Sequence, residues 1–466
     1  YSIIKQHTPE EVNIYILDFE AETLKAFENA PHIGDVILSY DAEKVTNLMK
    51  TLYKELENRK KKFSDFGGTY TTFIEESGKS VPNIIVAINN YATFTEIYPD
   101  KEDALNYLTR EGTKYGIYFV ITATGTNAIK YKMIQNFGQT ITLQFNDEAN
   151  YTMILGKTGG LLPQHFEGRG LIKVDKNIYE FQTARLVKDN NPYKFVREES
   201  KKIADKYSGY KANKIAVLPK KITTEILKPY ITEKLNIPIG MEKNTLNMSY
   251  YKLEEHYIHL ILSEDKSYLQ FAKDFANLIQ EQYKNLELAV IDEDNEIQDL
   301  NGDIKHITGR KQAEEMIDEL YQLILERNNE YKTAIEENRN CKEFNKKVFI
   351  INSVRTLLDN KDSVRVEKLE LALEKGSKNY NVHFIIFDEV KKVSIMTAKK
   401  WYKEHVKVED GMWIGRGFAN QYTFRVSNNK GELKKDITDL NFAIAIDKGN
   451  AKIIKILNTE EEQLDE

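Results

Sequence analysis

A lysine and a serine stand between an apolar segment and a helix-like run in HLILSEDKSYLQF, residues 259–271. A phosphate-binding loop has this order: backbone N–H groups wrap the phosphates, a lysine reaches the β- and γ-phosphates, and a hydroxyl binds Mg²⁺. Lys266 and Ser267 can supply the last two groups, but the loop has none of the glycines that its sharp turn requires. Glu264 and Asp265 occupy that place and repel phosphate. By itself, the stretch is either a degenerate nucleotide loop without competent ATP hydrolysis or an ordinary strand–turn–helix.

Two strand-like segments end where the Mg²⁺-binding strand of a nucleotide site would end. NIIVAINN finishes with Asn89 and Asn90, and VFIINS finishes with Asn352 and Ser353. A hydrolytic site carries carboxylates here, which hold Mg²⁺ and polarise the attacking water. Asparagine can ligate Mg²⁺, but it supplies neither negative charge nor a base. We therefore interpret both ends as polar strand termini and predict no metal site.

Arg110 is the remaining candidate for a catalytic side chain. It precedes the segment IYFVITAT, in the region where ring ATPases present an arginine finger to a neighbouring subunit. The alternative is an arginine on a solvated helix surface, which the sequence alone favours. The eight histidines show no metal-ligand spacing, and neither a CxxC nor a G-x-S-x-G motif occurs.

The composition indicates a folded chain from a reducing compartment. Its 466 residues are 41% hydrophobic and 30% charged, enough for two to four domains of about 100–200 residues each. The net charge of -6 does not predict a nucleic-acid-binding surface, and the single Cys341 excludes an intramolecular disulfide. No apolar run approaches the roughly 18–20 residues of a membrane span. Because the chain starts at Tyr1 and shows no signal peptide, we expect a piece of a longer protein, with any membrane attachment outside it.

Short apolar runs alternate with longer amphipathic stretches, which is typical of βα units around a mostly parallel sheet. A helix is predicted over residues 41–63, where apolar residues recur at helical spacing and Asp41 is the expected N-cap. The strands expected in the first half are NIYILDF (13–19), NIIVAINN (83–90), IYFVITAT (117–124) and TITLQF (140–145).

The second half repeats this order, and five segments that match the first half in the same order indicate a duplication. LELAVID corresponds to NIYILD, which pairs Asp292 with Asp18. The helix-like stretch 312–331 corresponds to the first helix, and KVFIINS corresponds to NIIVAINN. VHFIIFD then corresponds to IYFVITA, and GRGFA to GRGLI. This order places HLILSEDKSYLQF at the start of the second copy, where a phosphate-binding loop would stand. The predicted domains are 1–205 and 206–457, followed by an acidic tail over 458–466.

Four segments together resemble FtsK/SpoIIIE-type ATPases. HTPEEVNIYILDFEAETLKAFENAPHIGDVI resembles the part after the phosphate-loop helix, and PNIIVAINNYATF lies at the family's metal strand. LTREGTKYGIYFVITATGTNAI resembles the sensor segment, and NYTMILGKTGGLLPQHFEGRGLI resembles the segment that closes the domain. The tandem arrangement resembles more narrowly the membrane ATPases of type VII secretion. Gly125 and Thr113 replace a family glutamine and arginine, so only Arg110 remains of the sensor's polar residues, and the first copy's phosphate loop is not in this chain.

The resemblance implies an α/β fold of two tandem RecA-like P-loop NTPase-type domains, with mostly parallel sheets flanked by helices and a degenerate second copy. It implies ATP and Mg²⁺ as cofactors, with weak or absent binding in the second module. We therefore leave open whether the chain is an enzyme and expect little or no intrinsic ATPase activity.

The resemblance also implies the C-terminal cytosolic part of a type VII secretion motor at the cytoplasmic face of the cell membrane. Such a part would recognise and help export small WXG-type helical-hairpin proteins and would regulate an upstream ATPase module. Expected partners are these substrates, other secretion-machine subunits and further copies in a full-length hexamer, with no nucleic acid and no membrane contact through this chain. Two alternatives remain: a residual ATP-binding module that uses Lys266, Ser267 and Asn352, or a DNA translocase fragment, which predicts salt-sensitive DNA binding.

Overall fold

The chain forms two compact units, Tyr1–Val217 and Leu218–Glu466, each with its own sheet and core. The predicted division after residue 205 falls inside helix α8 (Pro192–Lys206), whereas the units meet at Val217 and Leu218. Of the predicted acidic tail, 458–466, the part from residue 461 onward lies outside the described residues. The computed structural model describes residues 1–188, 191–232, 235–359, 361–376 and 380–460.

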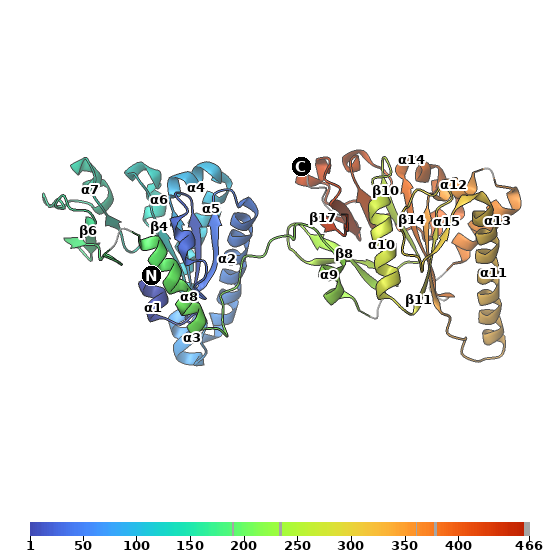
Figure 1. Cartoon of the computed structure of the whole chain (residues 1–466), viewed down its shortest axis with the longest axis horizontal. Coiled ribbons are helices and arrows are strands. Elements are labelled where there is room, and N and C mark those ends of the chain that lie inside the picture. Colours follow the sequence, from blue (N-terminus) through green and yellow to red (C-terminus); the bar gives the residue numbers. More distant parts are fainter. Residues whose placement is uncertain (189–190, 233–234, 360, 377–379, 461–466) are drawn as a thin grey trace. The chain divides into compact units, whose positions relative to one another are not determined.

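The first unit is built on a parallel four-stranded sheet in the order β2-β1-β3-β4 (Figure 1). Side chains of β1 enter two different apolar clusters: Tyr15 and Leu17 lie in one, Ile14 and Ile16 in the other. The strand is therefore covered on both faces, as its continuous apolar sequence predicts. The strands are β1 Val12–Asp18, β2 Ile33–Leu38, β3 Asn83–Asn89 and β4 Ile117–Ile121.

Helices cover both faces of this sheet. Helix α2 confirms the helix predicted over 41–63, and its apolar residues pack beside Leu17 with those of α5. Asp41 is the N-cap residue of α2, as predicted, but its side chain does not cap the first turn: its Oδ2 accepts the Leu38 N–H at 3.0 Å instead. The helices of the unit are α1 Ser2–Gln6, α2 Ala42–Phe63, α3 Tyr70–Ser77, α4 Tyr91–Ile97, α5 Glu102–Gly112, α6 Tyr131–Ile134, α7 Glu148–Leu155 and α8 Pro192–Lys206.

A small antiparallel sheet lies beside the main sheet of the first unit (Figure 1). The strand expected over 140–145 forms only over β5 (Ile141–Thr142), and it pairs with β6 (Arg169–Val174), which in turn pairs with β7 (Asn177–Gln182). Leu143 is exposed, so the apolar letters of that segment do not mark a core strand. Helix α7 and Leu171 give this sheet a core of its own.

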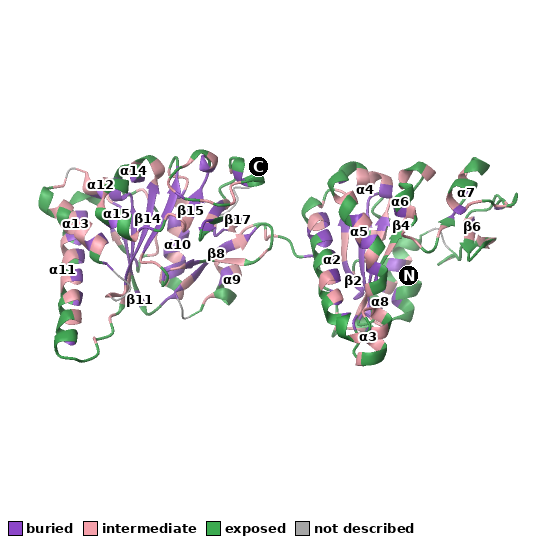
Figure 2. Ribbon diagram, turned by 180° about the vertical axis from the view of Figure 1, so that it is seen from behind, coloured by how far each residue is buried: buried purple, intermediate pink, exposed green. Residues whose placement is uncertain are grey.

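The second unit has one mixed sheet, in the order β12-β11-β13-β14-β10-β15-β16-β17-β8-β9. Neighbours from β12 to β15 are parallel, and neighbours from β15 to β9 are antiparallel. Its central strands are the most completely buried part of the unit (Figure 2). The strands are β8 Asn236–Glu242, β9 Met248–Lys252, β10 Ile258–Ser263, β11 Leu286–Ile291, β12 Lys305–Ile307, β13 Lys346–Asn352, β14 Val382–Glu389, β15 Gly411–Ile414, β16 Phe442–Asp447 and β17 Asn450–Ile456.

Helices on both faces complete the second unit and confirm the predicted α/β class. Helix α10 packs on one face, and α11, α13 and α15 pack on the other. No helix in the described ranges is long and apolar enough to cross a membrane. The helices are α9 Thr224–Leu227, α10 Leu269–Gln282, α11 Gly309–Glu336, α12 Val354–Leu358, α13 Ser363–Lys375, α14 Val390–Ser394 and α15 Lys400–His405.

Candidate functional site

The carboxyl ends of the parallel strands of the second unit all lie at one edge of the sheet, which is where open α/β sheets bind ligands. The strand that leads into Lys266 and Ser267 is β10, in the middle of the sheet, between β14 and β15. Lys266 has φ +63°, a left-handed conformation that is unfavourable for any residue except glycine. The chain thus makes a sharp turn at this point without a glycine.

Lys266 is held by an acid from the loop after β11. Its Nζ contacts the carboxylate of Glu296, whose Oε2 accepts a hydrogen bond from Asn352 Nδ2 at 3.1 Å. The same Nδ2 donates to Asp292 Oδ1 at 2.8 Å, and Asn352 Oδ1 accepts the Tyr268 hydroxyl at 3.0 Å. The amide of Asn352 is therefore used on both sides, and the ends of β10, β11 and β13 are joined into one polar network.

The network is largely removed from water. Asp292, Tyr268 and Asn352 are buried, and Asp292 Oδ2 also accepts the Ile297 N–H at 2.7 Å. Burial raises the pKa of the Tyr268 hydroxyl, so it stays protonated and acts as a donor. At the end of the neighbouring strand, burial raises the pKa of Asp388 to about 6.

A Gly-Arg-Gly turn packs directly against the loop that contains Lys266. A Cβ on Gly417 would lie 2.2 Å from the carboxyl carbon of Glu264, and one on Gly415 would lie 2.9 Å from Ser267 Oγ. Both glycines have positive φ, at +88° and +84°. The Ser267 hydroxyl itself contacts the Asp265 carboxylate. Of the two acids of the loop, Glu264 therefore packs against the Gly-Arg-Gly turn, and Asp265 contacts the hydroxyl that would bind Mg²⁺.

These residues do not fit Mg²⁺ and ATP. Lys266 is paired with Glu296, the Ser267 hydroxyl is used by Asp265, and the Asn352 amide has a partner on each side. No glycine opens the loop for backbone N–H contacts to phosphate. In the described ranges, no cluster of three or more acids, histidines or cysteines is arranged to hold a metal ion.

The first unit has the same pair of residues at the corresponding strand ends. Asn89 Nδ2 donates to Asp18 Oδ1 at 2.9 Å, as Asn352 does to Asp292. The hydroxyl of Thr122, after β4, donates to Asn89 Oδ1 at 2.8 Å and thus takes the place of Tyr268. The asparagines predicted to be polar strand termini therefore orient a buried aspartate of the adjacent strand.

The residue after each strand also adopts the same conformation in the two units. Asn90 and Ser353 both have φ +63°, and each caps the following helix through its side chain, by accepting the N–H of Thr93 at 3.3 Å and of Thr356 at 3.2 Å. Asp18 and Asp292 each end an apolar strand-like run, but chain order pointed to the asparagines of the next strand and did not select these aspartates as site residues. The parallel register, which pairs Asp18 with Asn89, would have been the signal.

Arg110 lies on α5 of the first unit. Its Nε donates to Glu111 at 3.0 Å, and its guanidinium lies over the Tyr107 ring at 5.6 Å. Both partners belong to its own helix, and the side chain is about half exposed. The structure of the unit thus shows Arg110 on a helix surface, where it is accessible to a partner.

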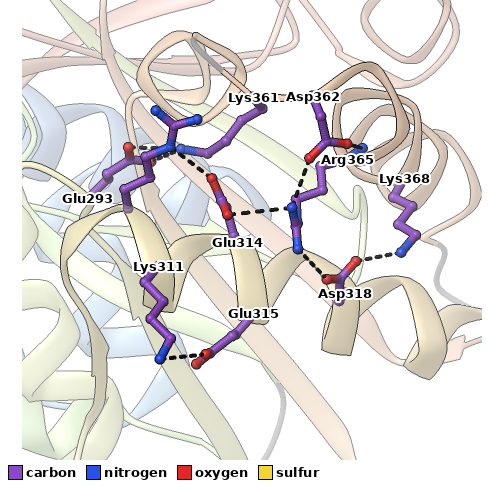
Figure 3. Close-up of polar contacts among 10 residues, drawn as sticks. Glu293, Lys311, Glu314, Glu315, Asp318, Lys361, Asp362, Arg365 and Lys368 are labelled. Atoms are coloured by element: carbon purple, nitrogen blue, oxygen red, sulfur yellow. Dashed lines mark hydrogen bonds and ion pairs between the residues drawn. The ribbon is translucent and has the colours of Figure 1, made fainter.

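A second polar network begins one residue beyond Asp292 (Figure 3). Lys361 Nζ lies 2.8 Å from both carboxylate oxygens of Glu293, and its side chain is fully buried. Arg365 on α13 pairs with Glu314 and Asp318 of α11 at 3.4 and 3.3 Å. These pairs fix the loop after β11 and helix α11 against α13, on the side of the sheet opposite α10.

Comparison with known proteins finds relatives of this chain. Residues 1–157 match the model of the FtsK/SpoIIIE family. This part of the first unit is thus similar to an FtsK/SpoIIIE domain. The chain is 24% identical over 77% of its length to the ESX secretion system protein EccC of Geobacillus thermodenitrificans, and 25% identical over 55% to YukB of Bacillus subtilis. It spans a quarter of the first of these relatives and 18% of the second.

Solved structures extend the likeness to both units. ATPases 2 and 3 of EssC from Geobacillus thermodenitrificans cover 98% of this chain, which covers 87% of theirs, with a TM-score of 0.82 and 20% identity. A second match is to ATPases 2 and 3 of EccC from Thermomonospora curvata, solved in complex with a signal sequence peptide. This match covers 98% of this chain and 84% of the EccC chain, with a TM-score of 0.55 and 17% identity. The predicted fold of two tandem RecA-like P-loop NTPase-type domains is confirmed. The chain is thus similar to the cytoplasmic part of type VII secretion ATPases.

Proposed function

We propose that this chain acts in a type VII secretion motor by recognising exported proteins and regulating an upstream ATPase module, and that its second unit does not hydrolyse ATP. The proposal rests on the observation that Lys266 is paired with Glu296 and Ser267 with Asp265, both within the same unit. The second unit keeps its packed sheet and helices, while acids of the same chain bind the side chains that would hold a nucleotide. Lys266, Ser267 and Asn352 then serve as structural remnants of a nucleotide site.

The substrate side of the proposal is supported by the Thermomonospora curvata EccC structure, whose ATPases 2 and 3 bind a signal sequence peptide. We propose that this chain binds the export tails of small WXG-type proteins in the same way. In the full-length protein it would work at the cytoplasmic face of the membrane, with other secretion subunits and within a hexamer. Arg110, exposed on α5, would then be available to a neighbouring subunit as an arginine finger.

Two measurements on the whole chain test this function. Fluorescence anisotropy with labelled C-terminal peptides of WXG-type proteins should show saturable binding that a scrambled peptide lacks. Steady-state ATPase assays should show turnover far below that of a complete motor, unchanged by Lys266→Ala. Turnover comparable to a complete motor that Lys266→Ala abolishes would overturn the proposal and favour the alternative of an active ATP site. Salt-sensitive DNA binding without peptide binding would favour a translocase fragment.

A further inference from the structure

We infer that Glu296 is an internal ligand of the second unit: its carboxylate takes the place of a nucleotide phosphate and holds the strand ends together without nucleotide. This deepens the proposed non-hydrolytic role of the unit, because it explains how the module keeps its arrangement. In an intact P-loop site, the lysine reaches the phosphates and the strand-end residue reaches Mg²⁺ bound to them, so the ligand bridges the two. Here one carboxylate bridges Lys266 and Asn352 directly.

The chemistry of the two bridges is alike. A carboxylate, like a phosphate, offers anionic oxygens to an ammonium group and to N–H donors, and such charge-assisted hydrogen bonds are stronger than neutral ones. The two Glu296 oxygens are divided between the two partners: Oε1 faces Lys266, and Oε2 accepts from Asn352. The side chains of Glu296 and Lys266 are 25% and 29% exposed, respectively, so their attraction is screened less than that of a surface pair.

The first unit provides an internal comparison. Its Asp18–Asn89 pair forms without any lysine or glutamate, so the equivalent pair in the second unit does not need Glu296. Glu22 stands four residues after Asp18, as Glu296 stands four residues after Asp292, yet Glu22 is exposed and has no ion-pair partner among the residues that the structure describes. Glu296 is therefore drawn into the site by Lys266 and not by the strand ends alone.

The left-handed turn at Lys266 points to the same conclusion. A non-glycine residue at φ +63° is strained, and it persists only when surrounding contacts hold it in place. The described contact of this side chain is its ion pair with Glu296, and the Lys266 carbonyl accepts the Leu269 N–H at 3.1 Å at the start of α10. Loss of the carboxylate should therefore loosen the loop, the start of α10 and the segment around Asn352 together.

Chemical rescue by an external anion tests this inference on the whole chain. Glu296→Ala should lower the melting temperature of the second unit and raise hydrogen exchange in residues 264–268 and 352–358. Glu22→Gln is the matched control and should change neither. Inorganic pyrophosphate at millimolar concentration should raise the melting temperature of Glu296→Ala, but not that of the unmodified chain. The double variant Lys266→Met/Glu296→Ala should not respond, because the cation that would bind the anion is gone.

Each outcome decides the matter. Rescue by pyrophosphate that requires Lys266 supports an internal ligand at a phosphate site. Equal responses in the unmodified chain, the single variant and the double variant would show general salt stabilisation and overturn the inference. A Glu296→Ala chain with unchanged stability and exchange would also overturn it. If Glu296→Ala does not fold, Glu296→Gln removes the charge at nearly constant shape and is measured in the same way. The peptide-binding assay is independent of these results, so failure of the proposed function and failure of this inference are distinguishable.

Discussion

Replacing Gly417 by alanine probes how tightly the Gly-Arg-Gly turn is packed against the loop that contains Lys266. Two effects act on the unfolding free energy. Alanine at a left-handed φ costs about 1–2 kcal/mol, which is partly offset by about 0.4–1 kcal/mol from the stiffer unfolded chain. In addition, the new Cβ would lie 2.2 Å from the Glu264 carboxyl carbon, so the glutamate or the turn must move. Overpacking of this kind costs about 1–3 kcal/mol.

Gly431 is the matched control, because it has φ +58° and open space around the position of a Cβ. The difference between Gly417→Ala and Gly431→Ala isolates the steric part, about 1–3 kcal/mol. For a domain of about 150–250 residues, this difference corresponds to roughly 2–12 °C in melting temperature. The double variant Gly417→Ala/Glu264→Ala should recover most of it, since the second change removes the group that is hit.

Tryptophan fluorescence during urea or thermal unfolding measures this effect in the second unit alone. The chain has two tryptophans, Trp401 and Trp413, and both are buried in that unit. Trp413 also donates from Nε1 to the carbonyl of Arg416 at 2.8 Å, so it reports directly on the turn. Equal destabilisation by Gly417→Ala and Gly431→Ala, or no recovery in the double variant, would refute the packing argument.

Two further predictions concern charged groups of the second unit. Lys361→Met removes the described ion-pair partner of the Glu293 carboxylate and should lower the unfolding free energy by about 3–5 kcal/mol. Arg365→Ala, at a partly exposed pair, should have a smaller effect that weakens at high salt, and urea unfolding at low and high salt measures both. Burial lowers the pKa of His259 to about 3 and of His383 to about 4, so the unfolded chain binds protons first and stability falls as the pH drops below about 6.5. The raised pKa of Asp388 acts in the opposite sense, with stability lost as the pH rises from about 4 to about 6, so urea midpoints against pH for Asp388→Asn should show the histidine effect alone. A midpoint in that variant that does not fall between pH 7 and pH 5 would contradict the assignment.

The strands and the long helices could be predicted from the sequence because their burial is local and periodic. The apolar runs at β1 and β3 and the helical spacing in α2 are each visible within one segment. The segment 140–145 was mispredicted because its apolar letters belong to a two-residue strand of a small side sheet with an exposed Leu143. Hydrophobicity alone does not distinguish a core strand from such a segment.

The candidate site could be predicted only in part, for a different reason. Lys266 was recognisable because it belongs to a motif with fixed spacing, and Asn352 was recognisable from the order of the strands that follow that motif. Glu296 belongs to no motif: it lies in an irregular loop and reaches Lys266 because parallel pairing places the ends of β10, β11 and β13 at one edge of the sheet. Contacts between residues 30 and 56 positions apart depend on that pairing, which a single sequence does not specify.

Strand β4 has a consequence for how the first unit behaves at high concentration. It is an outermost strand of its four-stranded sheet in the described part of the unit, and Tyr118 and Val120 on it are exposed, in contrast to the buried side chains of β1. An uncovered apolar edge offers a row of free backbone N–H and C=O groups to any other strand. Where nothing covers β4, we therefore expect this unit to aggregate edge to edge at high concentration, even at temperatures at which it stays folded.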